Sequence, residues 1–263
     1  MLETLRETAP GVVEAPMEPG WAAFRGAFGG WTAAHALLAA RRLVPGLPPA
    51  SLSIDFLAGI GPGNVRSAAR LVHETRSTRF VQVATSQDDA PRALTSVVLA
   101  ARRPAARVDA VAMPDCPPPE KLARLQVPDA PVTWADRFDL RIAAGRLLQP
   151  NPAMRSLFWT HLQDPSPAPE ATIAVLADAN LPRIFFHFER IVPIATVTMS
   201  VHFHAVGDEL AGALVEPVLL EAQAQVARDG LFDQQVRAWS RHGTLLATST
   251  QLVRYDLPPA GAA

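Results

Sequence analysis

The sequence contains almost no cysteine, and its positive and negative charges nearly cancel. A single cysteine, Cys116, in 263 residues excludes a disulfide within the chain and a zinc site made of four thiolates. The 24 Lys and Arg residues and the 25 Asp and Glu residues leave a formal charge of −1. Because a nucleic-acid backbone is bound through clustered basic side chains, this balance predicts no nucleic-acid partner.

Long uncharged hydrophobic segments are missing as well. The longest one with a helical pattern, 31–40, ends at Arg41 and is half as long as the roughly 20 residues that cross a bilayer. The N-terminal segment carries Glu3 and Glu7 and lacks the apolar core of a secretory signal. The sequence therefore predicts a cytoplasmic protein with no membrane partner.

Motifs that identify several common enzyme classes are absent. There is no G-x-S-x-G nucleophile elbow, which disfavours a covalent serine hydrolase. The glycines fit neither a phosphate-binding P-loop nor a dinucleotide fingerprint. His202 and His204 lie two residues apart, but no third metal ligand accompanies them. We therefore expect no metal and no other cofactor, and we expect the two histidines to be structural or to line a pocket.

The composition is that of a folded protein with a large core. Apolar residues make up 49% of the chain and charged residues only 19%, which excludes a disordered chain. Prolines are concentrated in one region, since 12 of the 25 lie between Pro104 and Pro169. Proline cannot continue a helix or pair inside a sheet. We therefore predict an N-terminal unit at 1–110, a proline-rich linker at 111–133 and a C-terminal unit at 134–263.

Both units show the same order of elements, a helix followed by several strands. The first helix, over 24–43, combines a glycine-rich start with Ala and Leu residues and basic residues at its end. Alternating apolar residues and turn signals predict the strands of this unit, over 52–57, 65–76, 78–86 and 93–102. In the second unit we expect a helix over 172–179 and 181–185 and strands over 197–204, 218–228, 232–240 and 244–254. The order predicts an α+β fold, in which helices cover one face of an antiparallel sheet.

The two units also share local sequence. Ser53–Ala58 parallels Ser200–Ala205, and the identical residue recurs 152 positions later for Arg76, Phe80 and Arg102. A period of about 150 residues indicates a duplicated domain rather than an array of short repeats.

Four segments carry a resemblance to a known family. They are the FGG-aromatic start of the first helix at Phe28–Trp31, the strand at Ser51–Phe56, the segment Leu220–Gly230 and the ending Gly243–Tyr255. Their order and spacing resemble those of acyl-CoA thioesterases with two hotdog domains, the thioesterase II-like family.

The resemblance implies a fold and an activity. The fold is a double hotdog, in which each repeat wraps an antiparallel sheet around a long helix and the two sheets join. The activity is hydrolysis of an acyl-CoA to a free acid and CoA, with no metal and no covalent serine. Sheet edges left exposed in such a fold commonly pair with another copy, so we expect a homo-oligomer.

The resemblance also implies where the substrate binds. Backbone N–H groups at a helix start would polarise the thioester carbonyl, here near Gly29 and Gly30. Trp31 and His35 follow on the same helix and are expected at the substrate pocket. Close packing of the helix is the competing explanation for the two glycines and for His35.

The family holds its attacking water with an aspartate, a threonine and a glutamine. Gln251 follows a run of small hydroxyl residues in the last strand and matches the family glutamine. Gln223 stands where the family has threonine, and Thr198 stands where it has aspartate. These side chains can orient a water, but threonine is no general base near neutral pH. The sequence leaves four candidates open for a substitute carboxylate: Asp178, Glu221, Asp229 and Asp55.

Two other functions stay open. A hotdog protein that has lost its carboxylate would bind acyl thioesters without hydrolysing them, and the threonine at position 198 favours this alternative. A hydratase or dehydratase on the same fold would carry an Asp/His pair on a helix, which is not found here. The thioesterase hypothesis requires the side chain of Gln251 to face a crevice between the two units rather than solvent.

Overall fold

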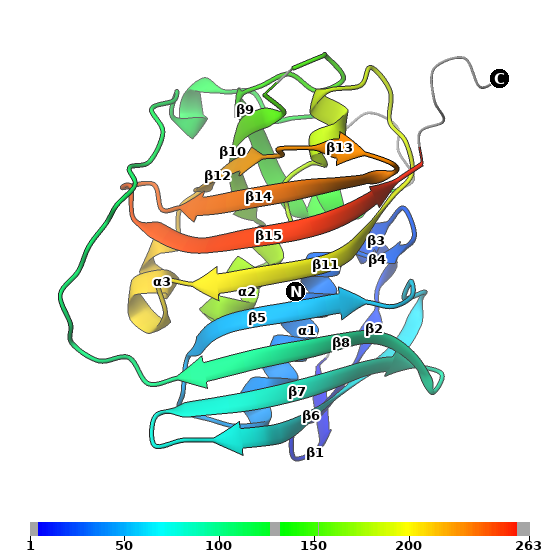
Figure 1. Cartoon of the computed structure of the whole chain (residues 1–263), viewed down its shortest axis with the longest axis vertical. Coiled ribbons are helices and arrows are strands. Elements are labelled where there is room, and N and C mark those ends of the chain that lie inside the picture. Colours follow the sequence, from blue (N-terminus) through cyan, green and yellow to red (C-terminus); the bar gives the residue numbers. More distant parts are fainter. Residues whose placement is uncertain (1–4, 127–131, 152, 257–263) are drawn as a thin grey trace.

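One antiparallel sheet extends through both halves of the chain (Figure 1). The computed structural model describes residues 5–126, 132–151 and 153–256, so part of the predicted linker 111–133 lies outside the described residues. From one edge to the other, the strands are β1 (Arg6–Ala9), β2 (Val12–Met17), β6 (Gly63–Glu74), β7 (Thr78–Gln87), β8 (Ala90–Ala100), β5 (Pro49–Phe56), β11 (Ile194–Phe203), β15 (Leu245–Tyr255), β14 (Leu231–Trp239), β12 (Val218–Gln223), β10 (Arg155–Leu162) and β9 (Phe138–Ala144). In addition, β13 (Ala227–Arg228) pairs with β14, and β3 (Ala22–Ala23) forms a separate hairpin with β4 (Gly26–Ala27).

Strands β5 and β11 join the two halves at the middle of the sheet. They pair antiparallel with Ser53 opposite Ser200, and the two hydroxyl oxygens lie 3.3 Å apart. Read outward from this seam, the order is β8, β7, β6 on one side and β15, β14, β12 on the other. The predicted α+β class with a large antiparallel sheet is therefore confirmed.

Helix α1 (Gly29–Leu43) lies behind the sheet and packs against β6, β7 and the second helix, α2, at Pro169–Leu176 (Figure 1). Its alanines allow this close packing on several sides, and most of its residues are buried. The arginines in its last turn interact favourably with the helix dipole. The predicted helix over 24–43 is confirmed from residue 29 onward, whereas the preceding residues form the β3–β4 hairpin.

The helix predicted over 172–179 and 181–185 is confirmed only in part. Helix α2 (Pro169–Leu176) has only 8 residues, and a turn follows it before the 3-10 helix η4 (Arg183–Phe186). Pro182 explains the interruption, because proline lacks an N–H donor and disfavours helical geometry in the residue before it. As a consequence, residues 177–182 form an irregular segment between α2 and η4. A third helix, α3 (Gly207–Ala213), follows β11.

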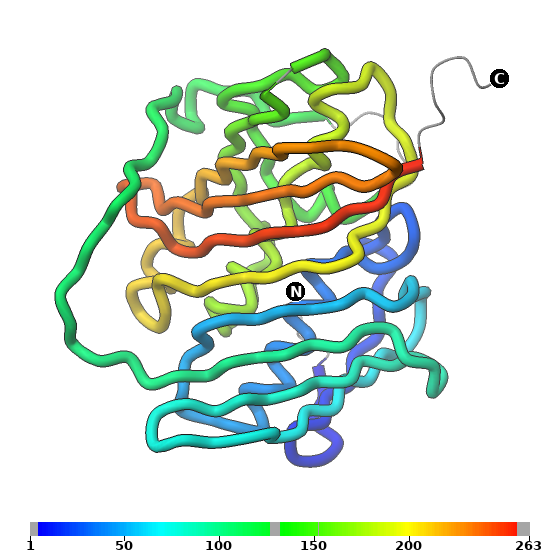
Figure 2. Tube along the Cα trace, in the orientation of Figure 1, coloured from blue at the N-terminus to red at the C-terminus, as the bar shows by residue number. Residues whose placement is uncertain are grey.

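The connection between the halves runs along the outside of the molecule (Figure 2). Residues 101–118 contain no helix or strand and are mostly exposed. The short 3-10 helices η2 (Pro119–Lys121) and η3 (Trp134–Arg137) lie beyond them, and a similar turn, η1 (Pro19–Trp21), precedes β3. Within the described ranges, no helix has both the length and the apolar character that crossing a membrane requires.

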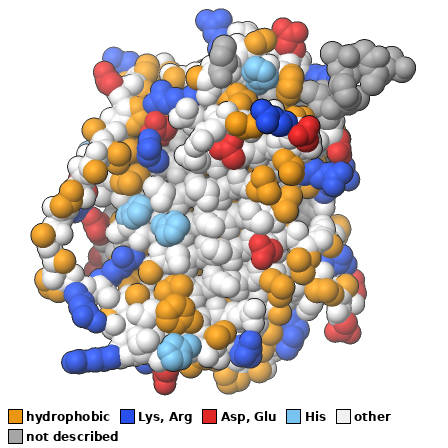
Figure 3. All heavy atoms as spheres, viewed as in Figure 1, with side chains coloured by type: hydrophobic (Ala, Val, Ile, Leu, Met, Phe, Trp, Pro, Cys, Tyr) orange, Lys and Arg blue, Asp and Glu red, His pale blue; other side chains and the backbone are white. Residues whose placement is uncertain are grey.

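The two faces of the sheet differ in exposure. One face is turned toward α1 and α2, and the other is exposed to solvent, with most of its charged side chains toward the rim (Figure 3). In β15, Gln251 and Val253 are buried, whereas Thr250 and Leu252 alternate with them and are exposed. Since side chains alternate along a strand, this pattern decides which residues of β11, β14 and β15 can reach the interior.

Candidate active site

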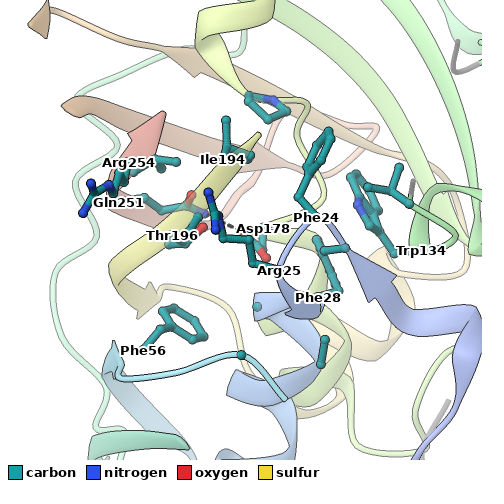
Figure 4. A pocket seen from close by; sticks show the side chains of 18 of the residues that line it. Phe24, Arg25, Phe28, Phe56, Trp134, Asp178, Ile194, Thr196, Gln251 and Arg254 are labelled. Carbon is teal, nitrogen blue, oxygen red and sulfur yellow. Dashed lines mark hydrogen bonds between the residues drawn. The ribbon is translucent and has the colours of Figure 1, made fainter. Parts of the chain in front are cut away.

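A pocket of about 430 Å³ opens where the start of α1 meets the ends of β5, β11 and β15. The segment between α2 and η4 also lines it and includes Asp178 (Figure 4). Most of the wall is apolar and aromatic, and its principal members are Phe24, Phe28, Phe56, Trp134, Leu181, Phe185, Ile191 and Ile194. A concave, apolar site with a few polar groups is typical of small-molecule binding.

A buried carboxylate, that of Asp178, lies in the wall of this pocket. Its Oδ2 accepts a hydrogen bond from the backbone N–H of Gly30 at 2.7 Å, and its Oδ1 accepts one from Nε2 of Gln251 at 2.8 Å (Figure 4). The side chain is held in place because the turn after α2 brings residue 178 to the N-terminus of α1. The positive end of the helix dipole and a free N–H there favour a negative charge.

Two glutamines extend this contact into the sheet. Gln251 of β15 and Gln234 of β14 are paired in the strand register, and both are buried. Nε2 of Gln234 donates to Oε1 of Gln251 at 2.9 Å, and Oε1 of Gln234 accepts from the backbone N–H of Arg183 at 3.1 Å. Buried amides need such partners, since an unsatisfied one costs about 1–3 kcal/mol.

The surroundings of Asp178 change its proton affinity. Burial raises the pKa of its carboxyl to about 7, because the charged form is poorly solvated inside the protein. The hydrogen bonds from Gly30 and Gln251 favour the charged form and offset this rise only in part. A carboxylate with a pKa near neutral pH can accept a proton from water and return it, which is the requirement for a general base.

The glycines at the start of α1 are required by close contacts. A Cβ atom on Gly29 would lie 2.9 Å from Oδ2 of Asp178, and a Cβ atom on Gly30 would lie 2.8 Å from the carbonyl oxygen of Val175.

Among the residues that the structure describes, the backbone N–H of Gly29 has no hydrogen-bond acceptor. The helix start thus combines one N–H that binds Asp178 with one that is available to a ligand.

The structure separates the other residues predicted on α1 from the pocket. Trp31 is buried in the core, and its ring stacks on that of His35 with 5.2 Å between centroids. Nδ1 of His35 lies 2.8 Å from Oγ of Ser67 on β6, and burial lowers the pKa of His35 to about 4, so the ring is neutral. Neither side chain is among those that line the pocket, so the expectation that they do is corrected.

Thr198 and Gln223 also lie away from the pocket. Thr198 is paired with Asp55 and Leu252, whose side chains are exposed, and Gln223 is itself exposed at the end of β12. A bulge in β11 between Thr196 and Thr198 shifts the alternation, so Thr196 lines the pocket instead. Of the three predicted water-binding side chains, the structure therefore brings only Gln251 into the pocket.

Among the four candidate carboxylates, only Asp178 lies in the pocket. Glu221 forms ion pairs with Arg155 at 2.9 Å and with Arg237 at 3.4 Å. Asp229 occupies the turn before β14 with φ of 52°, and Asp55 lies on the exposed face of β5. The sequence offers Asp178 as one of four candidates but contains no signal that selects it. Gln234 and Thr196 are not among the residues predicted from the sequence, although the position of Gln234 opposite Gln251 in a predicted hairpin was a usable signal.

Within the described part of the chain, no three His, Cys, Asp or Glu side chains cluster as metal ligands do. His202 and His204 lie on the exposed side of the sheet, where Nε2 of His204 is 3.1 Å from Oγ1 of Thr248.

Three arginines contribute the positive charge of the pocket: Arg25, Arg92 and Arg254. Arg25 forms an ion pair with Asp256, and Arg254 lies 3.9 Å from the same carboxylate. The side chain of Arg254 is 72% exposed, so its guanidinium group can bind an anion that approaches from solvent.

Two family models match the sequence over most of its length. Residues 17–101 match the N-terminal domain of acyl-CoA thioesterases, and residues 113–255 match the C-terminal domain. The comparison with curated proteins gave no match.

Solved structures with the same fold cover nearly the whole chain. A conserved protein of unknown function with a hotdog fold, from Alicyclobacillus acidocaldarius, is 30% identical, with a TM-score of 0.90 over 97% of this chain and 96% of that one. A putative thioesterase II from Thermobifida fusca is 19% identical, with a TM-score of 0.82 over 96% and 95% of the two chains. An acyl-CoA thioesterase II from Mycobacterium marinum is 21% identical, with a TM-score of 0.77 over 97% and 96%. The fold is a hotdog fold, and the chain belongs to the acyl-CoA thioesterase family.

Proposed function

We propose that the protein hydrolyses acyl-CoA thioesters to a free acid and CoA, with Asp178 as the general base. One observation carries this proposal: a buried carboxylate with a pKa of about 7 lies between a helix start and the amide of Gln251, in the wall of an apolar pocket. Membership of the acyl-CoA thioesterase family supports the same reaction.

In the proposed reaction, Asp178 and Gln251 hold a water against the thioester carbonyl. Asp178 takes a proton as the water oxygen bonds to the carbonyl carbon, and the oxygen of the resulting tetrahedral intermediate becomes negative. In the proposed reaction, the N–H of Gly29, a residue that lines the pocket, stabilises this charge. The C–S bond then breaks, and the proton on Asp178 passes to the leaving thiolate. Thr196 lines the pocket near Gln251 (Figure 4) and supplies a hydroxyl for the same water.

We also propose that the chain consists of two copies of one hotdog domain, as the internal sequence repeat indicates. The mirrored strand order around the β5–β11 seam supports two hotdog repeats, at 1–110 and 134–263, joined by a linker at 111–133. The helices are unequal, since α1 has 15 residues and α2 has 8. We infer one site per chain, built from the helix start of the first repeat and the strands of the second.

The acyl group is proposed to lie against the aromatic wall, and the CoA phosphates against the arginines. Replacing Arg254 with Ala is expected to raise KM for an acyl-CoA by about 3–10-fold with little change in kcat, since the lost contact is the same in the ground state and the transition state. Steady-state kinetics with an acyl-CoA and with the matching N-acetylcysteamine thioester, which lacks the nucleotide, measure this effect.

The short thioester is the internal control, and its KM should not change in this variant. Arg237→Ala is a matched control, because Arg237 is exposed on β14 and faces away from the pocket. An equal rise in KM for both thioesters would contradict a phosphate contact by Arg254.

The activity itself is tested by thiol release from a panel of acyl-CoAs of different chain length and branching. Turnover that saturates with at least one member is expected. Tight binding of acyl-CoA with hydrolysis at the background rate would instead indicate a non-hydrolytic acyl-thioester binding protein. Addition of water to an enoyl-CoA, without thiol release, would indicate a hydratase.

A further inference from the structure

From the hydrogen-bond pattern, we infer that Gln234 is a positioning residue for the site, because it fixes the direction in which the amide of Gln251 faces Asp178. The inference rests on the proposed function of Asp178 and concerns a residue that does not contact the carboxylate. Gln234 is 3% exposed and lies on β14 directly opposite Gln251.

A glutamine amide has a donor end and an acceptor end of nearly the same shape. The Nε2 end of Gln251 stabilises a charged Asp178, whereas its Oε1 end would place a partial negative charge against the carboxylate. The only other polar contact of Gln251 Nε2 within the described residues is to Sδ of Met199 at 3.4 Å, and a thioether is a weak acceptor. The direction of the amide must therefore be set from its other end.

The backbone N–H of Arg183 sets that direction, since it can donate but cannot accept. Oε1 of Gln234 must face this N–H, which turns Nε2 of Gln234 toward Oε1 of Gln251. Nε2 of Gln251 is then left to face Oδ1 of Asp178. One backbone donor thus determines the orientation of both amides in series.

Residue 183 is itself firmly held. Its side chain is fully buried, and the guanidinium group donates to Oγ of Ser156 and to the carbonyl oxygens of Leu181 and Ala222. The same group lies over the ring of Phe186, 4.5 Å from its centroid. The first donor of the series therefore belongs to a fixed part of η4.

Few charged side chains among the described residues lie near Asp178. The hydrogen bond from Nε2 of Gln251 is therefore one of the main electrostatic interactions of its carboxyl group. Arg254 from β15, Arg92 from β8 and Arg25 from the β3–β4 hairpin line the same pocket, and Arg183 lies behind Gln234. Helix α1 contributes its N-terminus and no acidic side chain in its first turn. The hydrogen bonds from Gly30 and Gln251 both lower the pKa of Asp178 against the effect of burial.

The test compares three variants of the full-length chain. Gln234→Met removes the donor to Gln251, and Gln251→Met removes the contact with Asp178. The third variant, Gln234→Met/Gln251→Met, combines them. The pH at which Asp178 is half protonated is followed by 13C NMR of the side-chain carboxyl, identified by its absence in Asp178→Asn. kcat/KM against pH is measured in parallel.

We expect Gln234→Met to raise the pH at which Asp178 is half protonated by up to about 1 unit. A higher value leaves less ionised base, so kcat/KM at neutral pH should fall by about tenfold. Because both changes act through one amide, the double variant should match Gln251→Met rather than show the sum of the two effects. Gln235→Met is the matched control for loss of an amide on this strand, since Gln235 is the next residue of β14 and is exposed on the other face.

If Gln234→Met fails to fold, Gln234→Leu takes its place. This uncharged side chain also cannot donate to Gln251, so the Gln251 amide is free to turn and the pH of half-protonation of Asp178 rises. An unchanged half-protonation of Asp178 in the Gln234 variants, or additive effects in the double variant, would overturn the inference. The NMR titration requires no turnover, so a wild-type protein that hydrolyses no thioester would reject the proposed function without deciding the role of Gln234.

Discussion

Replacing Asp178 with Asn is expected to lower kcat for thioester hydrolysis by about 10²–10⁴-fold, the contribution typical of a general base. Asn is similar in size and can still accept the hydrogen bond from Gly30, but it cannot take a proton from water. Thiol release under saturating acyl-CoA measures kcat. Thermal melting, monitored in the same preparation, confirms that the variant is folded.

Asp55→Asn is the matched control for this experiment, because Asp55 lies on the exposed face of β5 and is a carboxylate of the same type. Its kcat is expected to stay within about twofold of wild type, as for most surface substitutions. If Asp178→Asn retained a kcat close to that of wild type, another group would have to act as the base.

Replacing Gly30 with Ala is expected to impair both stability and catalysis. The new Cβ would lie 2.8 Å from the carbonyl oxygen of Val175 and 3.0 Å from its Cα, and backbone atoms cannot give way as a flexible side chain can. The start of α1 must then move away from α2, which is expected to lower the free energy of unfolding by about 1–3 kcal/mol. Because the N–H of Gly30 moves with it, kcat should fall by about 10²-fold. Chemical denaturation and thiol release measure the two effects.

Gly212→Ala provides the comparison for this substitution. Gly212 lies in α3, and a Cβ atom there would meet nothing within 4 Å, so alanine should be neutral or slightly stabilising. If Gly30→Ala were as stable and active as wild type, the close approach of α1 to α2 would not matter to the site.

Local sequence patterns were sufficient to predict much of the fold. The alternation of apolar residues identified β7 and β15 to within a residue or so, and the Ala/Leu pattern identified α1. The strand predicted over 218–228 is interrupted, because Oδ1 of Asp233 accepts hydrogen bonds from the backbone N–H groups of Gln225 and Val226. Such a contact depends on a side chain several residues away, which periodicity does not register.

The site was less predictable, because its central contacts join distant parts of the chain. Gln251 could be identified from its place in the last strand, but Asp178 contacts Gly30 across 148 positions. The apolar sequence around residue 178 indicated a continuous helix, which hid the turn that directs the carboxylate to the pocket. Thr196 was missed for a related reason, since the bulge between Thr196 and Thr198 turns its side chain into the pocket, whereas Thr198 follows the regular outward alternation of β11.

The pH dependence of kcat/KM for the wild-type protein tests the central role of Asp178 most directly. The base must be ionised to accept a proton, and its pKa is about 7. We therefore expect kcat/KM to fall about tenfold for each pH unit below the pKa and to reach a plateau above it. A profile that stays flat from about pH 5 to about pH 9 would contradict the assignment of Asp178 as the base.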